Sequence, residues 1–253
     1  MAGKIKLNNA DKQKFAFKGF SRKENFRSKR RFFLIVCEGE KTEPNYFESL
    51  KDSLPKGVLN VCAFKIDGTG HNTTSLVKEA KKLKKSWEKE IDRQIDRLWV
   101  VFDKDSFTAQ SFNSAIQQCL HKVDMACAWT NEAFELWYLL HFNYYNTGMS
   151  RTQYQSKIEE NFRSKGLVGY EYKKNSTEMY KILNQYGSQS NAIKNARNLE
   201  ILYAGQSNFA NQNPCTMVHK LVEELFGLEE EINLEKPDKN TPSTLAKKGK
   251  VLN

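Results

Sequence analysis

Apolar runs alternate with amphipathic segments along the first 143 residues. Segments that are apolar or rich in β-branched residues predict four strands, over Phe32–Cys37, Val58–Ile66, Leu98–Phe102 and Val123–Trp129. Helices are predicted after these strands, over Glu43–Lys51, Ser75–Arg97, Phe107–His121 and Asn131–Phe142. In Ser75–Arg97 the apolar residues are spaced three and four apart, which indicates an amphipathic helix. This order predicts an α/β fold with a mostly parallel four-stranded sheet and helices on both faces.

The pattern changes after Asn143. Helical spacing predicts further helices over Arg151–Arg163, Ser176–Tyr186, Gln189–Tyr203 and Pro214–Phe226, and no convincing strand pattern separates them. We therefore expect four parts, namely a flexible arm at 1–31, an α/β catalytic domain at 32–143, a helical C-terminal subdomain at 144–226 and a polar tail at 227–253.

The basic excess of the chain lies almost entirely in the arm. The net charge is +10, and residues 1–31 contain eleven Lys or Arg against two Asp or Glu. Such an arm contacts polyanions or serves as a solubilising tail, and we expect nucleic acid as a partner. Aromatic side chains interleave with these charges and either stack on bases or pack on the body; they are Phe15, Phe17, Phe20 and Phe26.

Composition indicates a cytoplasmic protein with a sizeable core. Hydrophobic residues make up 39% of the 253 residues, and no apolar run approaches the roughly 20 residues that a membrane helix needs. The N-terminus shows no secretory signal. The five cysteines are scattered without a CxxC pair, which favours reduced, buried thiols over disulfides or a zinc site.

Carboxylates follow two of the expected strands. Glu38 comes directly after the first strand, and Asp103 and Asp105 follow the third. In a parallel sheet the carboxyl ends of the strands share one edge, and alternate residues of an extended segment point the same way. Three convergent carboxylates need compensation, and Mg²⁺ or Mn²⁺ would provide it. Each motif alone is also common in plain solvated loops.

The order of a strand, "EG", a helix, and then a strand with "DxD" resembles the TOPRIM domain. In that resemblance Glu38 serves acid–base chemistry or metal binding, and Asp103 with Asp105 binds the metal. The chain also resembles the RloB-like family over Phe32–Phe226. The blocks that carry this resemblance are "LIVCEGEKTEPNYFESL" at 34–50, "VVFDKD" at 100–105, "FELWYLLHF" at 134–142, "AIKNARNLE" at 192–200 and "NPCTMVHKLVEEL" at 213–225.

The resemblance implies a metal-dependent TOPRIM-like nuclease that acts on RNA, tRNA included, or on DNA. It further implies a role in restriction or abortive infection against phage, beside an ATPase encoded nearby. One alternative is a non-catalytic effector or partner-binding subunit of an ATPase-containing defence complex. A phosphotransferase of the haloacid-dehalogenase type also uses a strand-end DxD, but it would not need Glu38. Homo-oligomerisation is left open.

Three further residues are candidates for the same site. Lys41 either neutralises phosphate charge or balances its acidic neighbours, and Glu43 completes the acidic group after the first strand. Glu135 is a polar group in an apolar helix, so it is either a catalytic residue or a partner in a salt bridge.

Three substrate-binding candidates come from the later segments. Lys174 and Asn195 either reach substrate or hold loops, and His141 is either a site residue or a satisfied core histidine.

The family pattern has Asn-Pro before the Phe-Glu pair, whereas Glu132 takes the place of that proline here. Glu132 would add a carboxylate near the site or cap the following helix.

Overall fold

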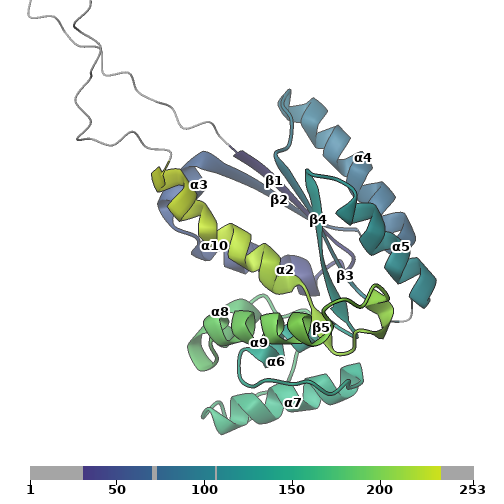
Figure 1. The fold of residues 1–253 in the computed structure, drawn as a ribbon. Helices are drawn as coiled ribbons and strands as arrows, with labels where there is room; N and C mark the ends of the chain where they lie inside the picture. Colours follow the sequence, from purple (N-terminus) through teal and green to yellow (C-terminus); the bar gives the residue numbers. More distant parts are fainter. Residues whose placement is uncertain (1–30, 70–72, 106, 235–253) are drawn as a thin grey trace, which may run out of the picture.

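The structure is a computed structural model that describes residues 31–69, 73–105 and 107–234. The expected basic arm, except for Arg31, and most of the expected polar tail lie outside the described residues. The described part is an α/β fold built on a five-stranded sheet in the order β2-β1-β3-β4-β5 (Figure 1).

Four of these strands are parallel, and they are β1 (Arg31–Cys37), β2 (Cys62–Gly68), β3 (Arg97–Asp103) and β4 (Met125–Asn131). The fifth, β5 (Cys215–Thr216), runs antiparallel to β4. Near-continuous apolar sequence in β1 and β3 is typical of strands that are covered on both faces. Residues Phe33–Cys37 and Leu98–Phe102 are accordingly buried. The α/β prediction with a mostly parallel sheet is confirmed.

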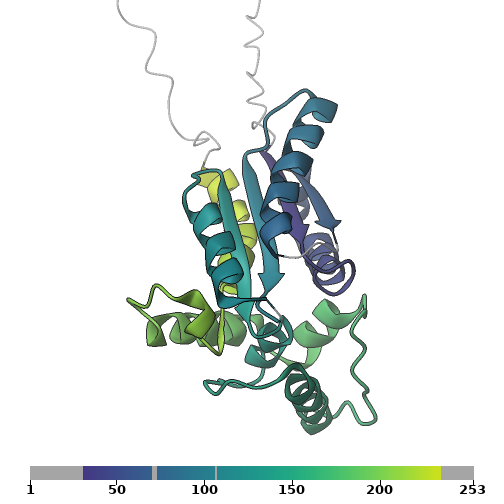
Figure 2. The ribbon, with the colours of Figure 1, turned by 90° about the vertical axis from the view of Figure 1, so that its right-hand side faces the viewer.

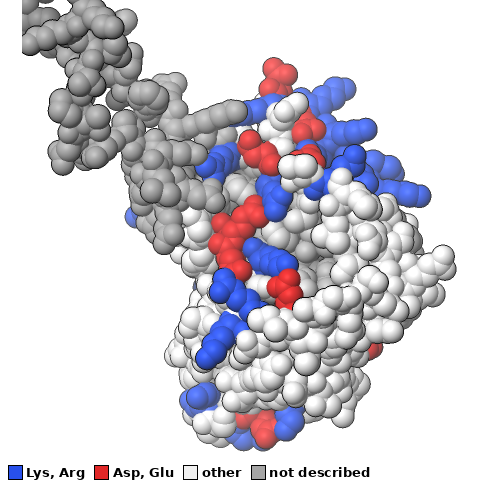
Figure 3. Space-filling view, in the orientation of Figure 1, with Lys and Arg blue, Asp and Glu red and all other residues white. Residues whose placement is uncertain are grey.

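Helices cover both faces of the sheet (Figure 1). One face carries α4 (Thr73–Ile91) and α5 (Ala109–Leu120), which contact each other as well as β3 and β4. The other face carries α2 (Thr42–Ser53), α3 (Lys56–Val61) and α10 (Val218–Leu234). The apolar stripe of α4 packs inward, while its lysines gather on the outer surface at the upper right of Figure 3.

A second group of helices lies at the carboxyl ends of the strands. The group consists of α6 (Glu135–Leu140), α7 (Arg151–Ser164), α8 (Met179–Tyr186) and α9 (Gln189–Leu202). Figure 2 shows the strand arrows pointing toward it. The buried helix α6 contacts both α7 and α9. The side chains at the strand ends therefore face residues from the second half of the chain.

The expectation of helices alone after Asn143 was wrong in one respect. Cys215 and Thr216 pair with the end of β4, and the Thr216 and Thr130 hydroxyls lie 2.9 Å apart. A strand of two residues is too short to show alternation. The helix that follows, α10, packs on the sheet rather than on the other late helices alone, and it continues to Leu234 instead of ending near Phe226.

Several expected boundaries also differ. Val58–Val61 belongs to α3, which starts after Pro55, and pairing with β1 begins only at Cys62. α4 ends at Ile91 instead of Arg97, and Arg97 is already the first residue of β3. α6 starts only at Glu135, since Asn131 is still paired with β5.

The cysteine side chains are buried, as the sequence indicated. All five are free and buried. Among the described residues, no helix combines the length and apolar character needed to cross a membrane.

Candidate active site

The end of β1 places two acidic side chains in one hollow. Glu38 is the first residue after the strand, and its backbone N–H donates to the Val101 carbonyl over 2.9 Å, which continues the pairing with β3. Glu43 lies in the first turn of α2 and is only 6% exposed. The positive end of the helix favours a carboxylate at this position.

Two glycines allow this chain path. A Cβ on Gly39 would lie 2.2 Å from Glu43 Oε2, and a Cβ on Gly68 would lie 2.6 Å from the Gly39 carbonyl oxygen. The end of β2 therefore supports the Glu38–Glu40 loop by direct backbone contact. Because neither glycine carries a side chain, the loop can lie directly against both the Glu43 carboxylate and the end of β2.

The end of β3 supplies the next two acids. Asp103 is the last strand residue, and its Oδ2 accepts the Phe134 N–H over 3.0 Å. Asp105 lies beyond the strand with a left-handed φ of 32°, and its N–H donates to the Glu132 carbonyl. The alternation argument from an extended segment therefore does not apply to Asp105, although a turn still brings both carboxylates to one side.

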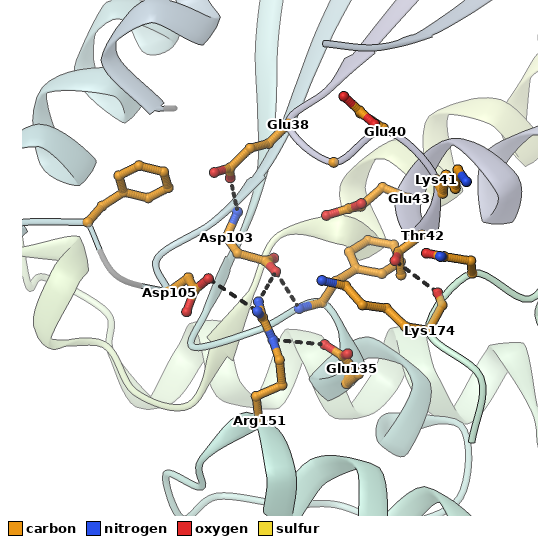
Figure 4. Close-up of a pocket in the computed structure, with 14 residues that line it drawn as sticks. Glu38, Glu40, Lys41, Thr42, Glu43, Asp103, Asp105, Glu135, Arg151 and Lys174 are labelled. Atoms are coloured by element: carbon orange, nitrogen blue, oxygen red, sulfur yellow. Dashed lines mark hydrogen bonds and ion pairs between the residues drawn. The ribbon is translucent and has the colours of Figure 1, made fainter. Parts of the chain in front are cut away.

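The guanidinium of Arg151 lies among these acids (Figure 4). It contacts Asp105 Oδ2 through Nη1 at 3.1 Å, Asp103 Oδ2 through Nη2 at 3.4 Å, and Glu135 Oε2 through Nε at 3.9 Å. Glu135 is 2% exposed, and its Oε1 accepts the Tyr172 hydroxyl at 2.9 Å. Burial lowers the pKa of Arg151, but Glu135, Asp103 and Asp105 together more than offset it, so the pKa rises overall.

These side chains line a cavity of about 580 Å³ between the strand ends and the late helices. Six acids and three cations line it, and the negative charge is therefore in excess. The acids are Glu38, Glu40, Glu43, Asp103, Asp105 and Glu135, and the cations are Lys41, Arg151 and Lys174.

Burial, and secondarily the neighbouring negative charges, raise the pKa of three carboxyl groups in the cavity. Burial raises the pKa of Glu38 to about 8, and the charges of Glu43 and Asp105 add to this, while the Asp103 N–H opposes it. Burial also raises the pKa of Glu43 and that of Asp103, again with help from neighbouring carboxylates. Perturbed acids gathered in a cavity are typical of functional sites.

The residues present fit a hard divalent cation by their chemistry. Glu38, Asp103 and Asp105 offer carboxylate oxygens, which Mg²⁺ and Mn²⁺ prefer, and Asp103 Oδ1 is buried without a hydrogen-bond partner. In the arrangement seen, however, no group of three or more His, Cys, Asp or Glu among the described residues is set to hold a metal ion. Arg151 contacts two of the three acids that would have to converge.

The structure brings most of the candidate residues predicted from the sequence to this cavity. Those that line it are Glu38, Lys41, Glu43, Asp103, Asp105, Glu135 and Lys174. His141 and Asn195 do not line it. Asn195 donates to the Leu140 carbonyl at 2.9 Å, and His141 is buried against Trp137. Asn195 thereby connects α9 with the end of α6, whereas His141 contacts its own helix and keeps its Nε2 buried without a hydrogen-bond partner.

Thr42 is the first residue of α2, and its hydroxyl donates to the Lys174 carbonyl. The capping role expected for Glu132 is corrected. Glu132 does not cap α6, because that helix begins at Glu135 after Phe134, and Glu132 is not among the residues that line the cavity. Its backbone carbonyl instead holds the Asp105 N–H.

Sequence reasoning missed Arg151. The residue was assigned only to a helix, and it lies 48 positions from Asp103. One local signal was available, because Ser150 and Gln153 form a capping box that makes Arg151 the first residue of α7. A cation at the positive end of a helix is unfavourable unless carboxylates lie nearby.

The chain was compared with known proteins. A sequence model of the RloB-like protein family matches residues 33–225, which span the sheet, the cavity and the late helices. No curated protein and no solved structure matches the chain significantly. The observed fold, a mostly parallel sheet followed by helices, is consistent with the TOPRIM-like expectation. Because the match covers most of the chain, this protein belongs to the RloB-like family.

Proposed function

We propose that this protein is a Mg²⁺- or Mn²⁺-dependent nuclease of the TOPRIM type that cleaves RNA or DNA phosphodiesters. The observation that carries the proposal is the gathering of Glu38, Asp103 and Asp105 in one cavity at the carboxyl ends of neighbouring parallel strands. Active sites of open α/β sheets form at such edges.

Asp103 and Asp105 would hold the metal, and the third carboxylate, Glu38, would act beside it. A divalent cation bound there would orient a water molecule and stabilise the charge that develops on the phosphoryl oxygens. Asp103 is the best placed of the three, since the Phe134 N–H holds Oδ2 while Oδ1 has no hydrogen-bond partner.

Glu38 is the proposed general acid. With its pKa raised to about 8, it keeps a proton at neutral pH. Its Oε2 accepts the Asp103 N–H, so the proton lies on Oε1, which is the oxygen free to deliver it to a leaving oxygen. Glu43 is buried beside it, and its negative charge further raises the pKa of Glu38.

The cations of the cavity fit a polyanionic substrate. Lys41 and Lys174 are exposed at the cavity, and ammonium groups attract phosphate oxygens. The Lys174 carbonyl is held by Thr42, so this part of the chain stays close to the first turn of α2. The N-terminal basic arm would add sequence-independent contacts to the phosphate backbone.

The biological setting is proposed from the family resemblance. RloB-like proteins are linked to restriction and abortive-infection loci, which supports a role in anti-phage defence. A neighbouring ATPase would control the nuclease.

The test combines substrates, metals and matched variants. The purified full chain is incubated with tRNA, single-stranded RNA or plasmid, in Mg²⁺, Mn²⁺ or EDTA, with and without the neighbouring ATPase. Glu38→Gln and Asp103→Asn are compared with Glu90→Gln, which changes an exposed carboxylate on α4. We expect metal-dependent cleavage that falls at least about a hundredfold in the two site variants and not in the control.

The same variants are tested for phage protection in cells. Loss of protection in both site variants, at normal expression and with an unchanged circular dichroism spectrum, supports catalysis. Protection that survives both changes, together with no cleavage under any metal condition, would show instead that the chain is a non-catalytic partner of the ATPase.

A further inference from the structure

The guanidinium of Arg151 occupies the place of a cation in the carboxylate cluster. It contacts one oxygen each of Asp103, Asp105 and Glu135, which come from the end of β3, the turn after it and α6 (Figure 4). All three acids line the cavity, and two of them are among the proposed metal ligands. One singly charged group thus stands where the proposed function requires a doubly charged ion.

The contacts of Arg151 are those of an imperfect fit. Arg97, in the same chain, holds Glu224 with Nε and Nη2 against both carboxylate oxygens, at 3.1 to 3.2 Å. This is the paired arrangement that makes arginine–carboxylate bridges strong. Arg151 instead divides its donors among three acids, and its buried Nε has no hydrogen-bond partner.

The position of Arg151 on its helix also indicates that it serves the cluster. It is the first residue of α7, where the helix dipole disfavours a positive charge. The backbone there is fixed by the capping box of Ser150 and Gln153, so the side chain can leave the acids without unwinding the helix. The side chain is 31% exposed and faces the cavity, which leaves it a path outward.

From these observations we propose that Arg151 is a built-in competitor of the metal ion, which holds the carboxylates in a resting state and must be displaced before the cation binds. The proposal rests on the proposed metal-dependent function. It assigns Arg151 a regulatory role. When the guanidinium leaves, Asp103 and Asp105 can converge on the metal ion. A buried acid left without its cation is costly, so the arginine and the metal exchange rather than leave together.

Equilibrium Mn²⁺ binding to the full chain tests the proposal without an activity assay. Wild type is compared with Arg151→Ala, Arg151→Lys and, as a matched control on the same helix, Arg163→Ala, whose arginine is exposed in the last turn of α7. If Arg151 occupies the acids at least nine-tenths of the time, Arg151→Ala should bind Mn²⁺ about tenfold more tightly or better. Arg163→Ala should bind as wild type does.

Two further measurements separate competition from a structural effect. The rise in Tm caused by Mn²⁺ should be larger for Arg151→Ala than for wild type, because tighter binding to the folded state stabilises it more. Added guanidinium at millimolar concentration should weaken Mn²⁺ binding to Arg151→Ala and leave wild type unchanged. Arg151→Lys keeps a charge without the guanidinium fork and should fall between the two, which provides the comparison if Arg151→Ala does not fold.

The outcomes distinguish this proposal from the one on which it rests. If wild type binds Mn²⁺ and Arg151→Ala binds no more tightly, the competitor role is overturned while the metal site stands. If no variant binds Mn²⁺, both proposals are wrong. Loss of binding in Asp103→Asn confirms that the measured site is this cluster.

Discussion

The Asp103 backbone N–H donates to Glu38 Oε2 over 3.2 Å, and this bond joins the ends of β1 and β3. The two strands are neighbours in the sheet, so the bond continues their pairing through a side chain. It fixes one oxygen of Glu38 and leaves the other toward the cavity. The same carboxyl group is thereby both a structural acceptor and a candidate for chemistry.

Glu38→Gln should separate these two roles. The amide oxygen of Gln can still accept the Asp103 N–H, so we expect a folded protein of unchanged or higher Tm in the absence of metal. Glu38→Ala loses the acceptor and should be destabilised by about 1 kcal/mol relative to Glu38→Gln. Thermal unfolding of the three proteins side by side measures the difference.

The pH dependence of the same variants follows from the raised pKa. Glu38 moves from an ordinary 4.5 to about 8 in the folded protein, so the folded state binds more protons than the unfolded state between these values. Its contribution to stability is therefore present below about pH 4.5 and is lost as the pH rises to about 8. Wild type without metal should lose stability more steeply in this window than Glu38→Gln. Parallel profiles would contradict the assignment.

Gly68→Ala should disturb the site from a distance. The added Cβ would meet the Gly39 carbonyl at 2.6 Å and the Glu40 Cα at 2.9 Å, and both are backbone atoms, so the loop must shift. We expect the chain to fold and any metal binding or cleavage to fall at least about tenfold, because misplacement of site groups by about 1 Å has effects of this size or larger. Gly57→Ala, where nothing lies within 4 Å, is the matched control and should leave both unchanged.

His141 should make the protein sensitive to acid. Burial lowers its pKa from 6.5 to about 4, although its backbone contacts with Trp137 and Tyr138 oppose this. The unfolded chain therefore binds more protons between these values, and stability is lost as the pH falls from 6.5 toward 4. The full difference corresponds to about 3 kcal/mol.

His141→Asn should flatten this acid limb, because asparagine keeps a donor for the Trp137 carbonyl and does not titrate in this range. His121→Asn is the control, since that histidine is exposed at the end of α5. Chemical denaturation at a series of pH values provides the measurement. An acid limb of equal slope in His141→Asn and wild type would show that another group is responsible.

Removal of residues 1–29 should weaken binding to nucleic acid without unfolding the chain. These residues lie outside the described part of the structure, and the prediction rests on their charge, since residues 1–29 contain nine Lys or Arg against two Asp or Glu, a balance of +7. Each phosphate contact by Lys or Arg releases counterions, so the truncated protein should also show a shallower salt dependence. Fluorescence anisotropy with a labelled RNA at several salt concentrations tests both effects. An identical affinity and slope would place the binding elements in the folded body.

The sequence by itself determined the frame of this protein. Continuous apolar runs in Phe33–Cys37 and Leu98–Phe102 can be satisfied only by burial on both faces, which predicts central parallel strands. Once these strands are neighbours, the acids that follow them must share an edge. Glu38 and Asp103 were therefore predictable from local pattern and topology alone.

Tertiary structure decided what those acids face. Arg151 and Lys174 line the cavity, and Tyr172 donates to Glu135, from segments whose local sequence encodes only a helix start or a loop. β5 pairs through two residues, too few to form a pattern, and α10 returns to the sheet because its buried face fits β4. Periodicity reports which side of an element is buried, whereas the partner across a cavity depends on how distant elements pack. For this reason the sequence predicted the carboxylates, and only the folded chain revealed the arginine among them.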